Sequence, residues 1–249
     1  MAKKLKDYYN IDCARLIASK ICEHKPNFPE AQFVQDVARK IRGQSFLARQ
    51  DIFANALLEH LEADYLKSVE YIHKILGPKL RQDSGMFTYG YWLWPFGRWV
   101  EQQAPRHPKH LKHSLNLIYE LTQRFTGEFA IRPLLDQHTL PVLKVMNKWS
   151  LDSSVHVRRL ASEGLRVRLP WAKKLDVFHN HFEDCQEILY NLRRAPEKFV
   201  QKSVGNNIND LYKDRPDLAR AVIKRLSLDR PVATSTQWII RHGQRSLRR

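Results

Sequence analysis

Hydrophobic residues recur along most of the chain at the three- and four-residue spacing of an amphipathic helix. In IDCARLIASKI (residues 11–21), Ile11, Ala14, Ile17 and Ile21 fall on one side of a helix, and Asp12 is its expected N-cap. Similar segments recur at about 30–42, 45–61, 64–76, 108–123, 138–149, 153–165, 186–193, 196–213, 216–227 and 234–246. Strand-like alternation is lacking and glycine is scarce, so the pattern predicts an all-α protein of roughly ten to thirteen helices.

One stretch departs from this periodicity. Residues 77–97 hold four glycines and two prolines among a cluster of aromatic residues that runs from Phe87 to Phe96. Aromatic side chains mostly fill cores, so we expect an irregular but ordered connector that packs by burying them. A stacking platform for nucleic-acid bases is the alternative.

An internal repeat lies in the second half of the chain. HVRRLASEGLRVRL (156–169) aligns with FVQKSVGNNINDLY (199–212), 43 residues further on, and a looser third copy begins at Trp238. Repeats of about 40–47 residues built from helix pairs are typical of HEAT-like α-solenoids. We therefore predict a HEAT-like repeat α-solenoid of helix pairs, forming a single domain over residues 1–249.

The charge of the chain indicates a polyanionic partner. Lysine and arginine number 42 against 26 acids, a formal net charge of +16. The repeat places Arg159, Lys202 and Arg241 at equivalent points, which stack along one face of a solenoid. This predicts a basic concave face that binds a nucleic-acid backbone. A basic helix face that only meets solvent is the alternative.

Other features exclude several classes of protein. Three widely spaced cysteines suggest reduced thiols and a cytosolic location. No signal-peptide core and no apolar run of about 18 residues is present, so we expect no membrane span. No phosphate-binding loop for ATP occurs, and no cofactor is expected. Two histidine-containing stretches, HNHFEDC (179–185) and RHPKHLKH (106–113), could suggest a metal site, but a polar loop and a basic surface patch are the favoured interpretations.

Carboxylates lie within this basic sequence, at Glu128, Glu163 and Asp210. A carboxylate near DNA weakens binding, so these acids suit chemistry at a cationic centre. Cleaving an N-glycosidic bond builds positive charge on the sugar, and a carboxylate can stabilise that state and orient the attacking water. The alternative for Glu163 is a surface ion pair with Arg159, one helical turn earlier.

Several long motifs resemble those of one family. TGEFAIRP (126–133), HVRRLASEGLRVRLPWA (156–172), SVGNNINDLYKD (203–214) and WIIRHGQRSL (238–247) resemble the AlkC family of bacterial DNA alkylation-repair glycosylases, HEAT-like relatives of the AlkD glycosylases. GMFTYGYWLWP and LKDYYNIDCARLIASKI fit the same family. The resemblance implies hydrolytic excision of N3-methyladenine and N3-methylcytosine from double-stranded DNA. It also implies that bent DNA is held on the concave surface, with no deep pocket for a flipped base.

The resemblance also implies roles for individual residues. Glu128 and Asp210 match the catalytic carboxylates, with Glu163 and Arg159 beside the lesion and Trp171 against the sugar or the cationic base. Contacts with the DNA backbone are expected from Arg158, Lys202, Asn206, Asn207, Arg241 and His242. We expect a monomer in the bacterial cytosol or nucleoid, without a metal.

One departure and two alternatives remain. Some family members carry a C-terminal immunoglobulin-like domain, which is not expected here because the sequence ends at Arg249. A non-catalytic HEAT-like module that binds damaged or structured nucleic acid is the main alternative function, and a protein-interaction scaffold is the other. Glu128 and Asp210 favour the enzyme, because a pure DNA binder would bind better without them.

Overall fold

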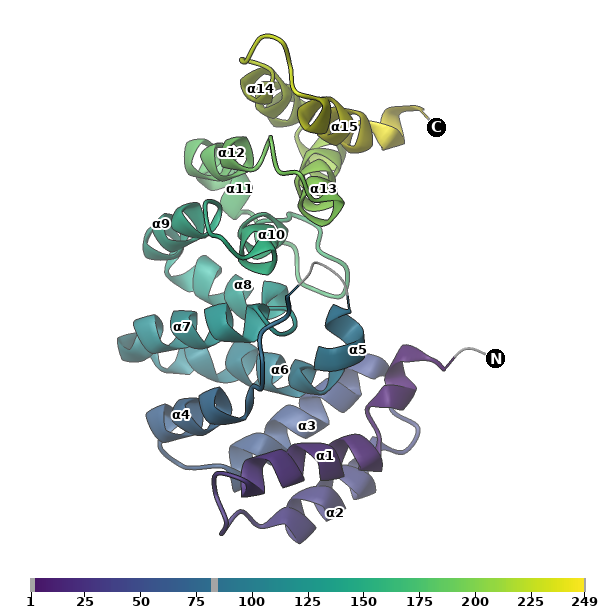
Figure 1. Cartoon of the computed structure of the whole chain (residues 1–249), viewed down its shortest axis with the longest axis vertical. Helices are drawn as coiled ribbons and strands as arrows, with labels where there is room; N and C mark the ends of the chain where they lie inside the picture. Colours follow the sequence, from purple (N-terminus) through teal and green to yellow (C-terminus); the bar gives the residue numbers. More distant parts are fainter. Residues whose placement is uncertain (1–2, 82–84, 249) are drawn as a thin grey trace. The chain divides into compact units, whose positions relative to one another are not determined.

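The chain is all-helical, as predicted. The computed structural model describes residues 3–81 and 85–248, and every regular element within them is a helix (Figure 1). None of the described helices is long and apolar enough to cross a bilayer. The chain divides into two compact units, Met1–Ala130 and Ile131–Arg249. Helix α8 (Glu128–Gln137) contains the boundary between them.

The first unit consists of two rows of packed helices. One row is α1 (Ile11–Cys22), α4 (Tyr65–Ile75) and α7 (Leu111–Thr122), and the other is α2 (Glu30–Ile41), α3 (Phe46–His60) and α6 (Trp94–Gln103). The short elements are η1 (Leu5–Tyr8), α5 (Met86–Gly90), η2 (Tyr91–Leu93), η3 (Ala104–Arg106) and η4 (Pro108–His110). The N-cap expected at Asp12 was wrong: Asn10 precedes α1, and its side chain accepts a hydrogen bond from the backbone N–H of Cys13 at 3.1 Å.

The second unit has the predicted repeat of helix pairs. Helices α9 (Thr139–Trp149), α12 (Phe182–Asn191) and α14 (Pro216–Leu226) pack in one row. Helices α10 (Val155–Glu163), α13 (Lys198–Asp214) and α15 (Thr234–Gly243) pack in the other (Figure 1). Short α11 (Val177–Asn180) and η5 (Arg245–Arg248) complete it. The three aligned sequence copies therefore correspond to α10, α13 and α15, which are successive neighbours in one row.

The aromatic connector is more helical than expected. Residues 86–97 form α5, η2 and the start of α6, whereas residues 77–81 are irregular and residues 82–84 lie outside the described residues. Trp94 packs against Phe46, Phe125 and Phe129 with ring centroids 4.7–5.6 Å apart. Phe96 is fully buried, Phe87, Tyr91, Trp92 and Trp94 are half-buried, and Tyr89 is 71% exposed.

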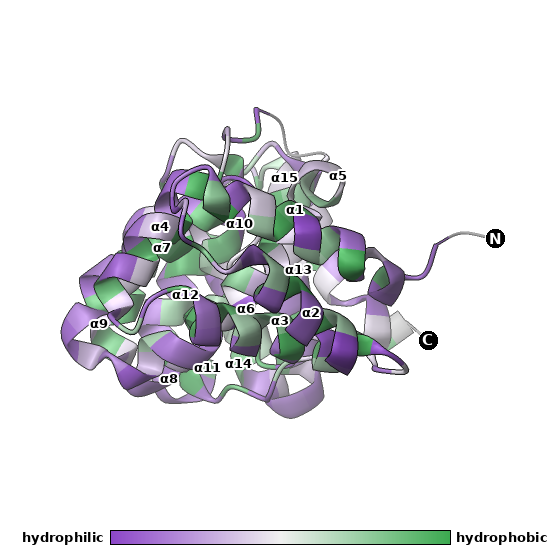
Figure 2. Ribbon diagram, turned by 90° about the horizontal axis from the view of Figure 1, so that it is seen from below, coloured by the Kyte–Doolittle hydropathy of each residue, from purple (hydrophilic) through white to green (hydrophobic). Residues whose placement is uncertain are grey.

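Close packing of α13 on α15 depends on two glycines. A Cβ added to Gly205 would lie 2.8 Å from His242 Cδ2, and one added to Gly243 would lie 2.7 Å from Ile208. Any larger residue at either point would push the helices apart. Elsewhere the helices carry hydrophobic and hydrophilic residues on the same ribbons, as amphipathic helices around a core do (Figure 2).

Candidate functional site

A buried ionic cluster joins α10 to α13 in the second unit. Arg166 lies just after α10 and donates from Nη1 to Glu163 Oε1 at 2.9 Å and from Nε to Asp210 Oδ2 at 2.9 Å. A longer contact of 3.4 Å joins its Nη2 to Asp210 Oδ1. Glu163 is 5% exposed, Asp210 3% and Arg166 8%. One guanidinium therefore links two carboxylates that are 47 positions apart in the sequence.

A seam of small polar side chains holds the two helices at this point. The hydroxyls of Ser162 and Ser203 lie 2.6 Å apart, and Asn207 Nδ2 donates to the backbone carbonyls of Ser162 at 2.9 Å and Ser203 at 3.1 Å. Asn207 is only 1% exposed. It lies in the contact between α10 and α13 instead of at the surface, because its amide supplies the donors that this polar seam needs.

The charge of Glu163 is stabilised despite its burial. Glu163 is the last residue of α10, and a helix C-terminus disfavours a negative charge. Burial raises the pKa of its carboxyl, but Arg159, Arg166 and a hydrogen bond from Ser203 outweigh this and leave the pKa below its ordinary value. The carboxylate is therefore ionised at neutral pH.

Arg159 and Arg158 have different surroundings. Arg159 Nη2 lies 3.6 Å from Glu163 Oε1, and its guanidinium lies over the ring of Phe199 at 4.7 Å. Arg166, at 2.9 Å, is the closer partner of Glu163. Arg158 points to the start of its helix and bonds to the carbonyls of Asp152 and Ser153 and to Glu197 Oε1. These bonds join α10 to the start of α13.

The loop after α10 presents Trp171 to solvent. Its side chain is 58% exposed and its φ is 65°, a left-handed conformation that a bulky residue rarely adopts. Arg132 of α8 holds this loop by donating hydrogen bonds to the carbonyls of Gly164, Arg166 and Lys173 at 2.5–3.1 Å. A strained residue persists only where its surroundings hold it, at a cost of about 1–3 kcal/mol.

Cationic side chains gather where α13 meets α15. A hollow of about 260 Å³ is lined by Trp238, Arg241, His242 and Arg245. The rings of Trp238 and His242 stack at 4.8 Å, and Arg245 donates to Asn206 Oδ1 at 2.9 Å.

Two cationic side chains in this region are not neutralised by described acids. Lys202 and Arg241 are exposed, and neither forms an ion pair with a described acid. The structure thus brings four of the predicted backbone-contacting residues, Lys202, Asn206, Arg241 and His242, onto α13 and α15. A basic concave face remains a prediction.

Glu128 begins α8 and is 8% exposed. An acid in the first turn of a helix is favoured by the helix dipole. Glu128 belongs to the first unit, whereas Glu163 and Asp210 belong to the second. The ionic cluster of Glu163, Arg166 and Asp210 therefore lies entirely within the second unit.

Neither histidine stretch considered from the sequence brings three ligand atoms together in the described residues. The described part of the chain has one group close enough to share a cation: Asp36, Glu59 and His60, whose ligand atoms lie within 4.8 Å of one another. His60 Nε2 already contacts Asp36 Oδ2 at 2.9 Å, and Arg39 contacts Oδ1 of the same carboxylate at 2.7 Å. This group serves as a polar link between α2 and α3.

Sequence reasoning missed two residues of the site. Arg166 had no role assigned from the sequence, because its link to Asp210 depends on packing between helices. Arg132 was unassigned, and its three bonds to loop carbonyls have no sequence signature. The one signal in the sequence was the spacing: Arg166 follows Glu163 by three positions, which is a spacing at which opposite charges can pair on a helix.

Three comparisons relate this chain to known proteins. A family model described as DNA alkylation repair enzyme matches residues 126–247. The uncharacterized protein YhaZ of Bacillus subtilis (strain 168) is 30% identical over 246 residues, which are 98% of this chain and 64% of that protein. The Pseudomonas fluorescens alkylpurine DNA glycosylase AlkC, bound to DNA containing an abasic site analogue, has a TM-score of 0.85 at 29% identity, covering 99% of this chain and 65% of that one.

AlkD2 from Streptococcus mutans is less similar, with a TM-score of 0.47 and 21% identity over 85% of this chain and 97% of that one. The chain spans just under two thirds of the length of both YhaZ and AlkC. The match to the family model includes Glu128, Glu163, Asp210 and the loop of Trp171. Residues 126–247 thus match the model of the DNA alkylation repair family, and the chain as a whole is similar in fold to AlkC.

Proposed function

We propose that the protein is a DNA glycosylase that hydrolyses the N-glycosidic bond of cationic alkylated bases, N3-methyladenine and N3-methylcytosine, in double-stranded DNA. The observation that carries the proposal is the cluster of Glu163, Arg166 and Asp210 within the segment that matches the repair family. A protein that only holds helices together has little need for two buried carboxylates on one guanidinium, because burying charges costs more than packing apolar groups.

The chemistry follows from charge. Loss of an alkylated base leaves positive charge on the sugar, and an ionised carboxylate stabilises that charge and orients the attacking water. A base that already carries a positive charge leaves without a general acid. Arg166 occupies the carboxylates in the free protein. A cationic lesion competes with that guanidinium for them, which favours charged bases over neutral ones.

Four further predicted residues have roles in this proposal: Trp171, Lys202 and Arg241 in binding, and Glu128 in catalysis. Trp171 presents an aromatic face from a loop that Arg132 holds by hydrogen bonds, and such a face attracts a cationic base or sugar. Lys202 and Arg241 carry charges that no described acid neutralises, and these charges attract backbone phosphates. Glu128 is proposed as the further catalytic carboxylate, by its place in the TGEF motif.

The test is release of methylated bases from dimethyl-sulfate-treated duplex DNA, read by mass spectrometry. We expect release by the wild type and a fall of at least about 100-fold in Asp210→Asn, the size expected for loss of one catalytic group. Glu128→Gln and Glu163→Gln should also lose activity.

Asp214→Asn is the matched control, because Asp214 lies on the same helix and also pairs with an arginine, Arg168, at 2.6 Å. It should retain near-normal release. Full activity of both Asp210→Asn and Glu128→Gln would refute the assignment of the catalytic residues. Absence of release by the wild type, with salt-sensitive DNA binding intact, would favour a non-catalytic DNA-binding module.

A further inference from the structure

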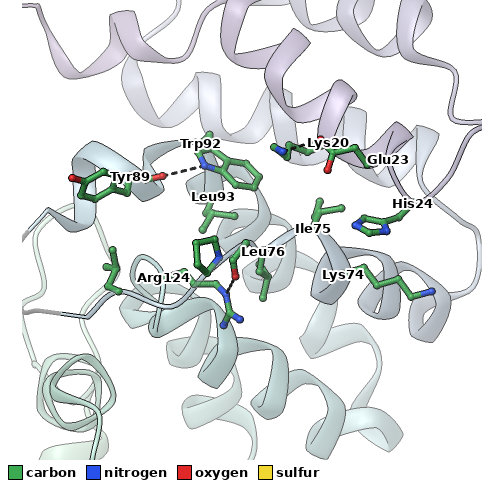
Figure 3. Close-up of a pocket in the computed structure, with 13 residues that line it drawn as sticks. Lys20, Glu23, His24, Lys74, Ile75, Leu76, Tyr89, Trp92, Leu93 and Arg124 are labelled. Atoms are coloured by element: carbon green, nitrogen blue, oxygen red, sulfur yellow. Dashed lines mark hydrogen bonds and ion pairs between the residues drawn. The ribbon is translucent and has the colours of Figure 1, made fainter.

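A pocket in the first unit lies apart from every residue assigned above. It has a volume of about 340 Å³ and is formed by the C-terminal ends of α1 and α4, the loop that follows α4, and the segment from α5 to η2 (Figure 3). This volume lies within the range of about 300–1,000 Å³ that is typical of small-molecule sites.

The floor of the pocket is apolar and aromatic. Ile75, Leu76 and Leu93 line it and are at most 3% exposed. Trp92 lies at its edge and donates from Nε1 to the carbonyl of Tyr89 at 3.1 Å (Figure 3). This bond satisfies the indole N–H, so the ring is held in place and offers apolar surface to a planar ligand.

The rim of the pocket is positively charged. Lys20 is paired with Glu23 at 2.8 Å, whereas Lys74 is exposed and has no acid partner among the described residues. His24 is also exposed at the same end (Figure 3). Arg124 lines the other end, where its Nε donates to the carbonyl of Gly77 at 2.6 Å and its Nη1 pairs with Glu120 at 2.7 Å, so the free positive charge of the rim lies at Lys74.

These charges favour an anion. Lys20, Lys74 and Arg124 line the pocket with Glu23, and Glu120 pairs with Arg124 at 2.7 Å, which leaves a formal charge of +1 with histidine neutral, carried by Lys74. A phosphate monoester carries a charge of about −1.5 to −2 at neutral pH. An occupant that combines such a group with a flat ring would match both the rim and the floor.

We propose that this pocket binds a nucleoside monophosphate, with its base against Trp92 and the apolar floor and its phosphate at Lys74 and His24. Two sources share this chemistry, a free nucleotide and the 5′-terminal nucleotide of a DNA strand. The proposal does not depend on the ionic cluster of α10 and α13 or on glycosylase activity.

Isothermal titration of the full chain at low ionic strength tests the proposal. We expect 2′-deoxyadenosine 5′-monophosphate to bind with a Kd below about 1 mM. Deoxyadenosine and inorganic phosphate should each bind at least about tenfold more weakly, because each supplies only half of the contacts. Absence of nucleotide binding, or equal binding of inorganic phosphate alone, would overturn the proposal.

Two variants locate the binding. Lys74→Glu should weaken nucleotide binding at least about tenfold by placing a negative charge beside the phosphate, and Trp92→Leu should weaken it by removing the ring. Lys40→Glu is the matched control, because Lys40 is an exposed lysine of α2 outside the pocket. Equal effects of Lys74→Glu and Lys40→Glu would contradict the site.

The source of the nucleotide is decided with short DNA strands in competition with the mononucleotide. Displacement by a 5′-phosphorylated strand, but not by its 5′-hydroxyl counterpart, would assign the pocket to strand ends. Displacement by neither strand would assign it to the free nucleotide. Equal displacement by both strands would contradict recognition of the phosphate monoester.

Discussion

Arg166→Met should strongly destabilise the protein. The substitution keeps much of the volume of the side chain but removes the charge that joins Glu163 to Asp210, leaving two carboxylates that are 5% and 3% exposed without their shared partner. Removing one member of a buried ion pair costs about 3–5 kcal/mol. For a chain of this size, that loss lowers the melting temperature by roughly 6–20 °C.

The loss should depend on pH. In the wild type the pKa of Glu163 is lowered, so this group stabilises the fold above its ordinary pKa and loses that contribution as the pH falls through its folded value. In the variant the carboxylate of Glu163 is buried with less compensation, which raises its pKa, so acid relieves the penalty by protonating it. The stability difference between wild type and variant should therefore be largest at neutral pH and shrink toward pH 4.

The assay is thermal and urea denaturation followed by circular dichroism, at neutral pH and at several lower values. Arg168→Met is the matched control, because Arg168 also bridges to α13, through Asp214, but is exposed. It should change stability much less than Arg166→Met. If the two variants lose equal stability, or if the loss in Arg166→Met is the same at every pH, the argument from buried charge is refuted.

Two further predictions follow from the contact between α13 and α15. Gly243→Ala should destabilise the fold by about 1–3 kcal/mol, because the added Cβ would lie 2.7 Å from Ile208; Gly97→Ala, where the nearest atom is 3.4 Å away, should cost less in the same thermal denaturation. Burial and the nearby Arg245 and Lys202 lower the pKa of His242, and a bound phosphate would favour its protonated form. If the protein binds DNA, affinity measured by fluorescence anisotropy should therefore rise as the pH falls, and His242→Gln should reduce that dependence; an unchanged pH profile in the variant would exclude this role.

Helical periodicity was enough to predict the class of fold and much of its order. The 43-residue repeat identified α10, α13 and α15 as equivalent helices, and they pack in succession. Helices α5 and α11 escaped prediction, because elements of five and four residues are too short to show an amphipathic period. Helix α6 also escaped prediction, because it begins inside the stretch whose glycines and prolines indicated an irregular connector. The start of α1 was misplaced because Asn10 and Asp12 are both good N-cap residues, and the choice depends on backbone geometry.

The candidate site was only partly open to sequence reasoning. Local spacing suggested Arg159 as the partner of Glu163, since the two are one helical turn apart. The chain turns after α10, however, and this turn brings Arg166 closer to the carboxylate and into contact with Asp210, 44 positions further on. Asn207 looked like a surface residue in the sequence but is buried between helices.

The sequence by itself determined which residues could form helices, which helices repeat, and that the chain carries a large positive charge, because these properties depend on local spacing and composition. Only the tertiary structure decided which charges are used internally and which stay free. Arg158 and Arg166 are engaged by carbonyls and carboxylates that folding brings to them, whereas Lys202 and Arg241 are left exposed. Ion pairing over distances of 3–4 Å depends on how the helices pack, and that packing joins residues that are far apart in the chain.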